Sequence, residues 1–322
     1  MAKIIAEFCQ NHNGDLAILQ EMVWAAKEAG ADYAKIQTLF AEDLTRRTEF
    51  EEGRMENGAV QILKRPYQPE YDRMKRLELS EKDHELFIET CRKAGITPLT
   101  TVFSRCRIPW VKALGFKTLK IASIDCASFP MIEELAGHFD HLIISTGATF
   151  SHEIVRTAQI LKSKQAAWTF LHCVSVYPTP LSRFNLRRMN FLKQFTPSVG
   201  LSDHSAPAKD GIKASVAALS LGAEWIERHF TILPQDQTKD GPVSINAVQL
   251  KELAYWARRP LKEVQNKVER DIPEYSSMLG TEDSELSHEE LVNRAYYCGR
   301  FANYVAGEVV YNWEDKPVTS SC

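Results

Sequence analysis

The chain has 322 residues, of which 44% are hydrophobic and 25% are charged, and its formal net charge is −3. This composition is typical of a globular protein and argues against a disordered chain. No apolar run approaches the ~20 residues that a membrane span needs. The small negative charge offers no broad positive field for nucleic acid. We therefore expect a globular protein that binds neither nucleic acid nor a membrane.

The N-terminus and the cysteines indicate the compartment. The sequence begins MAKIIAEF and passes straight into a strand-like pattern, without the basic region, apolar core and cleavage site of a signal peptide. The seven cysteines form no CxxC pair, which is typical of free thiols in a reducing compartment. We therefore expect a cytoplasmic protein. Cys9, Cys126 and Cys173 lie near predicted strand ends, where we expect small buried hydrophobes and keep a nucleophile as the alternative.

Short β-rich runs alternate with amphipathic helical patterns, which is the signature of βα units. The predicted strands span residues 3–8, 32–37, 97–103, 118–123, 141–146, 168–173, 198–203 and 224–230. The predicted helices span 15–30, 80–94, a segment through 110 and 114, 130–135, 152–162, 186–195, 212–221 and 247–268. Eight consecutive βα units predict an α/β fold, a (β/α)₈ TIM barrel with a short C-terminal extension.

Two segments fall outside this repeat. The loop at 38–79 is long and charged, and a loop of this kind is commonly a lid or a binding element, with structural ornament as an equal alternative. After residue 268 the pattern becomes acidic and turn-rich, and then aromatic and strand-like. We expect a barrel domain at 1–268 and an extension at 269–322 that packs against the barrel or a partner subunit.

Polar residues follow the predicted strands at their carboxyl ends, which share one mouth in a barrel. The runs LSDHSAP (201–207) and IERHF (226–230) carry His204 and His229, which we expect to form a metal site, although a lone histidine is more often a structural group. The other strand-end residues are Glu7, Lys35, Gln37, Thr101, Lys120, Ser123, Asp125, Ser145, Thr146, His172, Ser175, Ser202 and Glu227.

The residue types at these strand ends indicate their chemistry. Two lysines and several hydroxyls suit a small, highly charged anion. Glu7 and Asp125 offer carboxylates for proton transfer. Lys35 and Lys120 have apolar neighbours, so each requires a carboxylate or a ligand, and either could instead form a Schiff base as in barrel aldolases.

Seven segments closely resemble the sialic acid synthase family, and the match recurs in register over roughly residues 1–265. They are IIAEFCQNHNGD (4–15), AGADYAKIQT (29–38), KIASID (120–125), ISTGA (144–148), LHCVSVYPTP (171–180), GLSDHS (200–205) and LGAEWIERHFT (221–231). The resemblance implies condensation of phosphoenolpyruvate with an N-acetylated aldose, which gives a nine-carbon keto-sugar acid. Family members are dimers, so it also implies a possible homodimer.

The resemblance also implies a role for each site residue. His204 and His229 would bind Mn²⁺, with Mg²⁺ or Co²⁺ as alternatives, and the ion would polarise the sugar aldehyde. Glu7 and Asp125 would manage water and protons while C3 attacks the aldehyde, water adds at C2 and phosphate departs. Tyr177 and Gln37 would lie near the sugar. The phosphate and carboxylate of phosphoenolpyruvate would be held by Lys35, Thr101, Lys120, Ser123, Ser145, Ser175 and Ser202.

The sequence departs from the family pattern at three places. Asp125 stands where the family has Glu, and Val243 follows the Gly-Pro pair where the family has an Asp that contacts the sugar. The sequence reaches only to Cys322, so we expect it to lack the antifreeze-like domain of typical members. The alternatives to the synthase are a Schiff-base aldolase on the same barrel and a non-catalytic relative that binds phosphoenolpyruvate.

Overall fold

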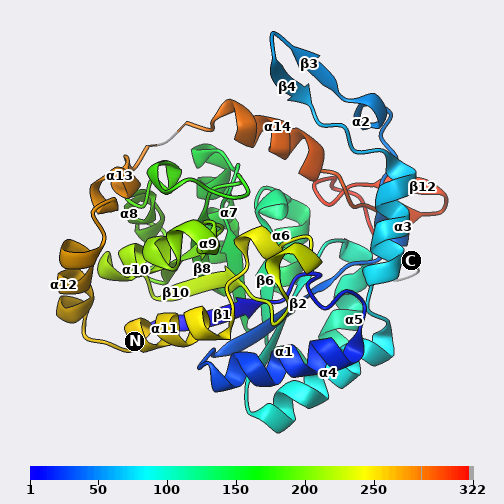
Figure 1. The fold of residues 1–322 in the computed structure, drawn as a ribbon. Coiled ribbons are helices and arrows are strands. Elements are labelled where there is room, and N and C mark those ends of the chain that lie inside the picture. Colours follow the sequence, from blue (N-terminus) through cyan, green and yellow to red (C-terminus); the bar gives the residue numbers. More distant parts are fainter. Residues whose placement is uncertain (284, 319–322) are drawn as a thin grey trace. The chain divides into compact units, whose positions relative to one another are not determined.

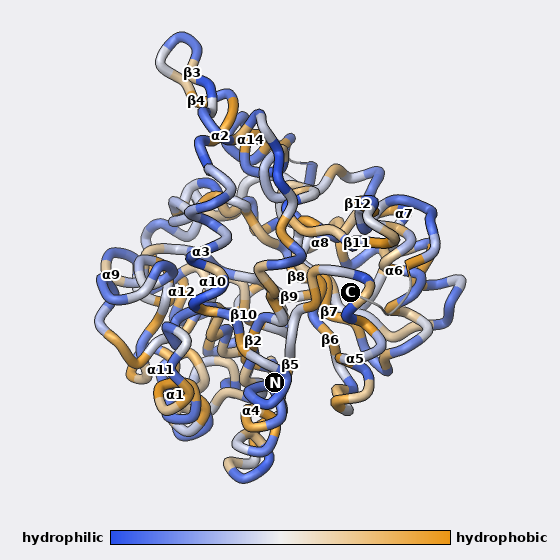
Figure 2. Tube along the Cα trace, turned by 90° about the vertical axis from the view of Figure 1, so that its right-hand side faces the viewer, coloured by the Kyte–Doolittle hydropathy of each residue, from blue (hydrophilic) through white to orange (hydrophobic). Residues whose placement is uncertain are grey.

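The computed structural model describes residues 1–283 and 285–318, and eight of its strands form a closed barrel (Figure 1). The order around the barrel is β1-β10-β9-β8-β7-β6-β5-β2, which confirms the predicted TIM barrel. Figure 2 shows β7 as a hydrophobic segment, as expected for a barrel strand that is buried on both faces. The barrel strands are β1 (Lys3–Glu7), β2 (Tyr33–Thr38), β5 (Thr97–Val102), β6 (Thr118–Ile121), β7 (His141–Ser145), β8 (Ala167–Cys173), β9 (Val199–Asp203) and β10 (Trp225–His229).

Local sequence signals explain where helices between the barrel strands begin and end. The Asp15 side chain caps α1, a Ser80–Asp83 capping box opens α4, and Gly95 ends α4 in the left-handed conformation. These helices are α1 (Leu16–Glu28), α4 (Glu81–Ala94), α5 (Ile108–Ala113), α6 (Phe129–Ala136), α7 (Ser151–Ser163), α8 (Arg188–Lys193), α9 (Pro207–Asp210), α10 (Lys213–Ser220) and α11 (Ala247–Ala257). The short 3₁₀ turns are η1 (Ala41–Asp43), η2 (Arg105–Arg107), η3 (Ser123–Asp125), η4 (Leu181–Arg183), η5 (Gln235–Gln237) and η6 (Gly241–Val243).

The predicted single helix at 247–268 is wrong. Helix α11 ends at Ala257, and α12 (Leu261–Asp271) begins after Pro260. Proline disfavours a helical conformation in the preceding residue and lacks the N–H that a continuous helix requires, so the periodic pattern is interrupted there.

The chain divides into two compact units, which are described separately. The first comprises Met1–Gln37, Ser80–Leu99 and Thr169–Ser284, and the second comprises Thr38–Leu79, Thr100–Trp168 and Glu285–Cys322. The division at residues 268 and 269 remains a prediction from the sequence. No helix within residues 1–283 and 285–318 is long and apolar enough to cross a membrane.

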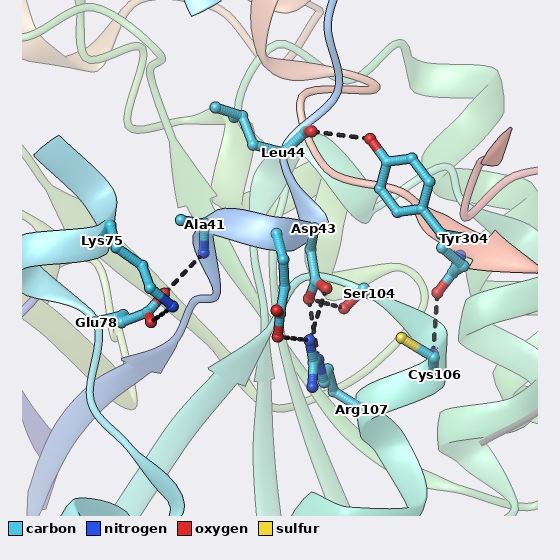
Figure 3. A network of polar contacts seen from close by, with 11 residues as sticks. Ala41, Asp43, Leu44, Lys75, Glu78, Ser104, Cys106, Arg107 and Tyr304 are labelled. Atoms are coloured by element: carbon cyan, nitrogen blue, oxygen red, sulfur yellow. Dashed lines mark hydrogen bonds and ion pairs between the residues drawn. The ribbon is translucent and has the colours of Figure 1, made fainter. Parts of the chain in front are cut away.

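In the second unit, the long segment after β2 has its own secondary structure. It contains α2 (Glu49–Glu52), a hairpin of β3 (Arg54–Glu56) and β4 (Ala59–Ile62), and α3 (Tyr67–Leu77). Figure 3 shows how it is anchored: the Asp43 carboxylate accepts hydrogen bonds from Ser104 and Arg107, and the Tyr304 hydroxyl donates to the Leu44 carbonyl. The segment at 38–79 therefore has secondary structure of its own, and its role as a lid or binding element remains a prediction.

The last part of the chain packs on the same segment. Helix α13 (Tyr275–Leu279) belongs to the first unit, whereas α14 (His288–Tyr297), β11 (Asn303–Val305) and β12 (Glu308–Val310) belong to the second. Tyr296 and Tyr297, expected in a strand-like stretch, end α14 instead, because Ser287 opens a helix with a capping box to Glu290. Phe301 joins the hydrophobic cluster of Leu44 and Phe103.

A buried ion pair joins β9 to β10 in the first unit. Arg228 Nη1 lies 2.5 Å from Asp203 Oδ1, and both side chains are fully buried. Burial alone would raise the pKa of the Asp203 carboxyl, but Arg228 and hydrogen bonds from Ser215 and Ser205 hold the pKa below its ordinary value. Because His204 follows Asp203 and His229 follows Arg228, this pair fixes the ends of both strands.

We predict that Arg228→Met lowers the free energy of unfolding by about 3–5 kcal/mol, because it leaves a buried carboxylate without its counter-charge. Urea denaturation at neutral pH measures the loss. The matched control is Arg259→Met, which breaks the pair with Glu263 at the surface, where water screens the charges, and should cost far less stability. Equal losses in the two variants would contradict the assigned importance of the buried pair.

Candidate functional site

In the first unit, one lysine lies between two carboxylates at the carboxyl ends of neighbouring strands. Lys35 Nζ forms an ion pair with Glu7 and lies 3.3 Å from Glu227 Oε1. The backbone register places Glu7 opposite Lys35, and all three side chains are buried. The two carboxylates offset the desolvation of the ammonium. Lys35 therefore has carboxylate partners of the kind that its apolar neighbours in the sequence led us to expect.

The two histidines expected to bind a metal lie side by side. His204 directly follows β9 and His229 ends β10, with ring centroids 5.2 Å apart. Burial lowers the pKa of both imidazoles, and for His204 the neighbouring His229 contributes as well. Both rings are therefore held neutral, which is the form that binds a metal ion. Tyr177 packs on His204, with ring centroids 4.2 Å apart.

A cluster of potential metal ligands includes one of these histidines. The ligand atoms of Cys9, His229 and Asp240 all lie within 4.8 Å of one another. Nδ1 of His229 is buried and has no hydrogen-bond partner among the described residues. Thiolate, imidazole and carboxylate are all metal ligands, so these side chains fit a divalent cation. Cys9 itself donates to Asp240 Oδ2 at 2.8 Å, and burial and then this carboxylate raise the pKa of the thiol well above its ordinary value.

The second unit contains a lysine surrounded by hydroxyl groups. Lys120 Nζ donates to Ser145 Oγ at 2.7 Å and to the Ile121 carbonyl at 3.1 Å. Thr101 lies opposite Lys120 in the register of β5 and β6, and Ser123 Oγ accepts a hydrogen bond from the Gly147 amide. An ammonium group, hydroxyls and a backbone amide are the groups that bind phosphate and carboxylate.

Asp125 is a buried carboxylate in the same unit. Its Oδ1 accepts hydrogen bonds from Ser128 and Asn312, while Oδ2 has no partner in the described part of the chain. Burial raises the pKa of Asp125 to about 6. This value makes the carboxyl group suitable for proton transfer near neutral pH.

The remaining predicted site residues differ in how far they are buried. Ser202 is buried in β9 opposite Glu227, and Ser175 is buried after β8. Gln37 is partly exposed in β2, and the Tyr177 side chain is 49% exposed. The first unit thus contains Glu7, Lys35, Gln37, Ser175, Tyr177, Ser202, His204 and His229, and the second contains Thr101, Lys120, Ser123, Asp125 and Ser145.

Three residues of these clusters were missed as site residues from the sequence. Cys9 was expected to be a small buried hydrophobe, and Asp240, which precedes the Gly-Pro pair at 241–242, was not among the predicted site residues. Asn312 lies 187 residues from Asp125 in the chain, in a stretch without a motif. A cysteine directly after a strand end was the one local signal, whereas the contacts of Asp240 and Asn312 depend on the folded loops.

Comparisons with known proteins give a consistent relationship. The NeuB family pattern matches residues 22–269. The N,N'-diacetyllegionaminic acid synthase of Legionella pneumophila is 34% identical over 298 residues, which cover 91% of this chain and 77% of that protein. The pseudaminic acid synthase of Campylobacter jejuni is 30% identical and covers 93% of this chain and 81% of its own. The crystal structure of the N-acetylneuraminic acid synthetase of Leptospira borgpetersenii has a TM-score of 0.68 at 27% identity, with 92% of each chain covered.

We predict that Asp125→Asn changes the pH dependence of stability. Because the pKa is raised from 3.8 in a model peptide to about 6, the ionised carboxylate is less favourable in the folded chain than in the unfolded one. The penalty is absent below about pH 4, grows between about pH 4 and 6, and reaches about 3 kcal/mol above that range. The variant should therefore gain stability relative to the parent as the pH rises, which urea unfolding at several pH values measures.

Asn312→Leu provides the complementary variant. Asn312 donates to the Asp125 carboxylate and lowers its pKa, so removing this donor should extend the loss of stability to higher pH. A stability difference between Asp125→Asn and the parent that stays constant from pH 4 to pH 8 would contradict the assignment. Such a pH-independent difference in the free energy of unfolding would reflect only how the new amide group is accommodated, and not the raised pKa of Asp125.

Proposed function

This chain belongs to the NeuB family of sialic acid synthases, and on that premise we propose that it condenses phosphoenolpyruvate with an aldose in a metal-dependent reaction. The products are a keto-sugar acid and phosphate. The observation that carries the proposal is the pair of buried imidazoles of His204 and His229, with ring centroids 5.2 Å apart, at the carboxyl ends of β9 and β10. The relatives named for legionaminic and pseudaminic acid support an acylated amino sugar as the aldose.

The proposed reaction balances without an external oxidant or reductant. C3 of phosphoenolpyruvate forms a bond to the aldehyde carbon, and the aldehyde oxygen takes a proton to become a hydroxyl. Water adds at C2, the bond between C2 and the phosphate oxygen breaks, and the ketone forms. A divalent cation at His204 and His229, with Mn²⁺ as the first candidate and Mg²⁺ or Co²⁺ as alternatives, would supply Lewis acidity for the aldehyde.

The chain's own side chains have separate roles in this proposal. Glu7 and Asp125 move protons to and from water and the leaving groups, for which the raised pKa of Asp125 is suited. Tyr177 and Gln37 orient the sugar. The groups that bind the phosphate and carboxylate of phosphoenolpyruvate are Lys35, Thr101, Lys120, Ser123, Ser145, Ser175 and Ser202.

The lysines fit charge binding better than Schiff-base chemistry. Lys35 is placed as a cation between two carboxylates, whereas a Schiff base requires a neutral amine. Lys120 is held by Ser145 and a backbone carbonyl, an arrangement that orients an ammonium toward an anion. Borohydride trapping of the chain on a carbonyl substrate, with activity that survives chelation, would favour the aldolase.

The test of the function is phosphate release from phosphoenolpyruvate in the presence of Mn²⁺ and a panel of aldoses. The panel includes N-acetylmannosamine, its 6-phosphate and diacetamido sugars, each with and without chelator. We expect release that requires both the sugar and the metal. His204→Ala and His229→Ala should abolish it, while His138→Ala, at an exposed position, should retain it.

The outcomes separate the remaining candidates. Full activity of both site variants would remove the two histidines from the mechanism. Binding of phosphoenolpyruvate without phosphate release from any sugar of the panel would favour the non-catalytic relative over the synthase.

We further predict that Lys120→Met weakens phosphoenolpyruvate binding by about 1.5–3 kcal/mol, or roughly 10- to 150-fold in Kd, because a charged contact is lost. Isothermal titration calorimetry measures the change. Lys162→Met, which removes an exposed lysine from α7, is the matched control. An unchanged affinity in Lys120→Met would exclude Lys120 from the binding site.

A further inference from the structure

Three segments of the first unit converge on a single cluster of metal-binding side chains. Cys9 follows β1, His229 ends β10, and Asp240 lies in the loop between β10 and α11. Their ligand atoms are mutually within 4.8 Å, and Cys9 Sγ lies 2.8 Å from Asp240 Oδ2. Ligands around a tetrahedral metal with bonds of 2.0–2.3 Å lie about 3.5 Å apart, so small side-chain shifts suffice to enclose an ion.

The backbone at Cys9 is held in an unusual conformation. Cys9 has a φ of 49°, in the left-handed region that a residue with a Cβ adopts only at a conformational cost. The Cys9 amide donates to Glu7 Oε1 at 2.6 Å, which holds the turn directly after β1. Cys9 as a whole is only 8% exposed, and its thiol is thereby directed to Asp240 and not into the apolar core.

The Asp240 loop is equally constrained. Asn11 Nδ2 donates to the Phe230 carbonyl and to Ser244 Oγ, and Ser244 Oγ donates to the Asp240 carbonyl at 2.6 Å. A Cβ at Gly241 would lie 1.8 Å from the Gln235 carbonyl oxygen, so only glycine permits this close turn. The carboxylate is therefore placed by a built loop and not by a mobile surface side chain.

His229 supplies the independent indication of a ligand. The residue is 9% exposed, and its buried Nδ1 lacks a hydrogen-bond partner among residues 1–283 and 285–318. A buried polar atom without a partner carries a desolvation penalty that a coordinated ion would remove. A thiol–carboxylate hydrogen bond of purely structural role would leave this nitrogen unexplained.

We propose that Cys9 and Asp240 join His229 as ligands of the divalent cation, so that the metal site of this chain contains a thiolate. This inference adds ligands to the metal site of the proposed function. It rests on the proposed function for the reaction that the metal serves, but not for the binding of the metal. Binding displaces the thiol proton to solvent, and the thiolate and carboxylate together neutralise the two charges of the cation. Because thiolate and imidazole prefer softer ions, the site should favour Zn²⁺, Fe²⁺ or Co²⁺ over Mg²⁺.

Cobalt titration of the metal-free chain, without substrate, tests the ligand set. A Co²⁺ ion bound by a thiolate absorbs in the near ultraviolet by sulfur-to-metal charge transfer, which nitrogen and oxygen ligands alone do not produce. We expect one Co²⁺ per chain with this band. Cys9→Ser should lose the band, and Asp240→Asn should keep it while binding at least about tenfold more weakly.

Two further variants keep the test decisive. Cys9→Gly removes the thiol and suits the backbone at φ 49°, so it should fold and still lack the band. Cys173→Ser is the matched control, because Cys173 lies 3.8 Å from His204 Nδ1 but is outside the three-residue cluster, and it should keep the band.

The possible outcomes distinguish this inference from the proposed function. Co²⁺ binding without the band, or a band that persists in Cys9→Gly, would overturn the thiolate ligand even if phosphate release depends on metal. A band that is lost in Cys9→Gly, in a protein that releases no phosphate with any sugar, would establish the thiolate site and contradict the synthase.

Discussion

Charged side chains at the ends of the barrel strands are withdrawn from water, and this constraint requires a partner for each of them inside the fold. Asp203 and Arg228 are each other's partners in a fully buried pair, and Lys35 has two carboxylates as partners. In each case the attraction between opposite charges offsets a large loss of hydration, so removing one member is more damaging than removing a surface charge. The strand ends are therefore rigid, and the groups that follow them are placed with little freedom.

Against this background, two buried atoms without partners in the described chain are informative. They are Nδ1 of His229 and Oδ2 of Asp125, which are among the buried side-chain atoms without a hydrogen-bond partner in the described residues. The fold accepts the cost of leaving such atoms unpaired mainly where a ligand or a proton can meet them. His229 belongs to the cluster with the thiol and carboxylate that could complete a metal site, and the other atom belongs to the carboxyl group with a pKa raised to about 6.

The segments outside the βα repeat influence this chemistry. Residues 38–79 and 285–318 pack together in the second unit. The Ala302 amide donates to the Asp43 carbonyl, and Leu44 and Phe301 belong to one hydrophobic cluster. From the same region, Asn312 donates a hydrogen bond to Asp125 and another to the Phe103 carbonyl. A residue of the C-terminal extension thus sets the environment of a candidate acid at a strand end.

The sequence by itself determined the eight βα units, because the period of hydrophobic residues, the caps at Asp15 and Ser80 and the glycine at position 95 act over a few residues. It also identified the strand-end lysines, histidines and carboxylates, since a parallel barrel brings the same end of every strand to one mouth. Pro260 was a local signal for the break between α11 and α12. The prediction of one continuous helix followed the periodic pattern around this proline and missed the break. Only the tertiary structure decided that Cys9 meets Asp240, that Asn312 meets Asp125 and that residues 38–79 are ordered. These outcomes depend on side chains brought together across up to 231 residues of chain, and no local pattern specifies such distant contacts.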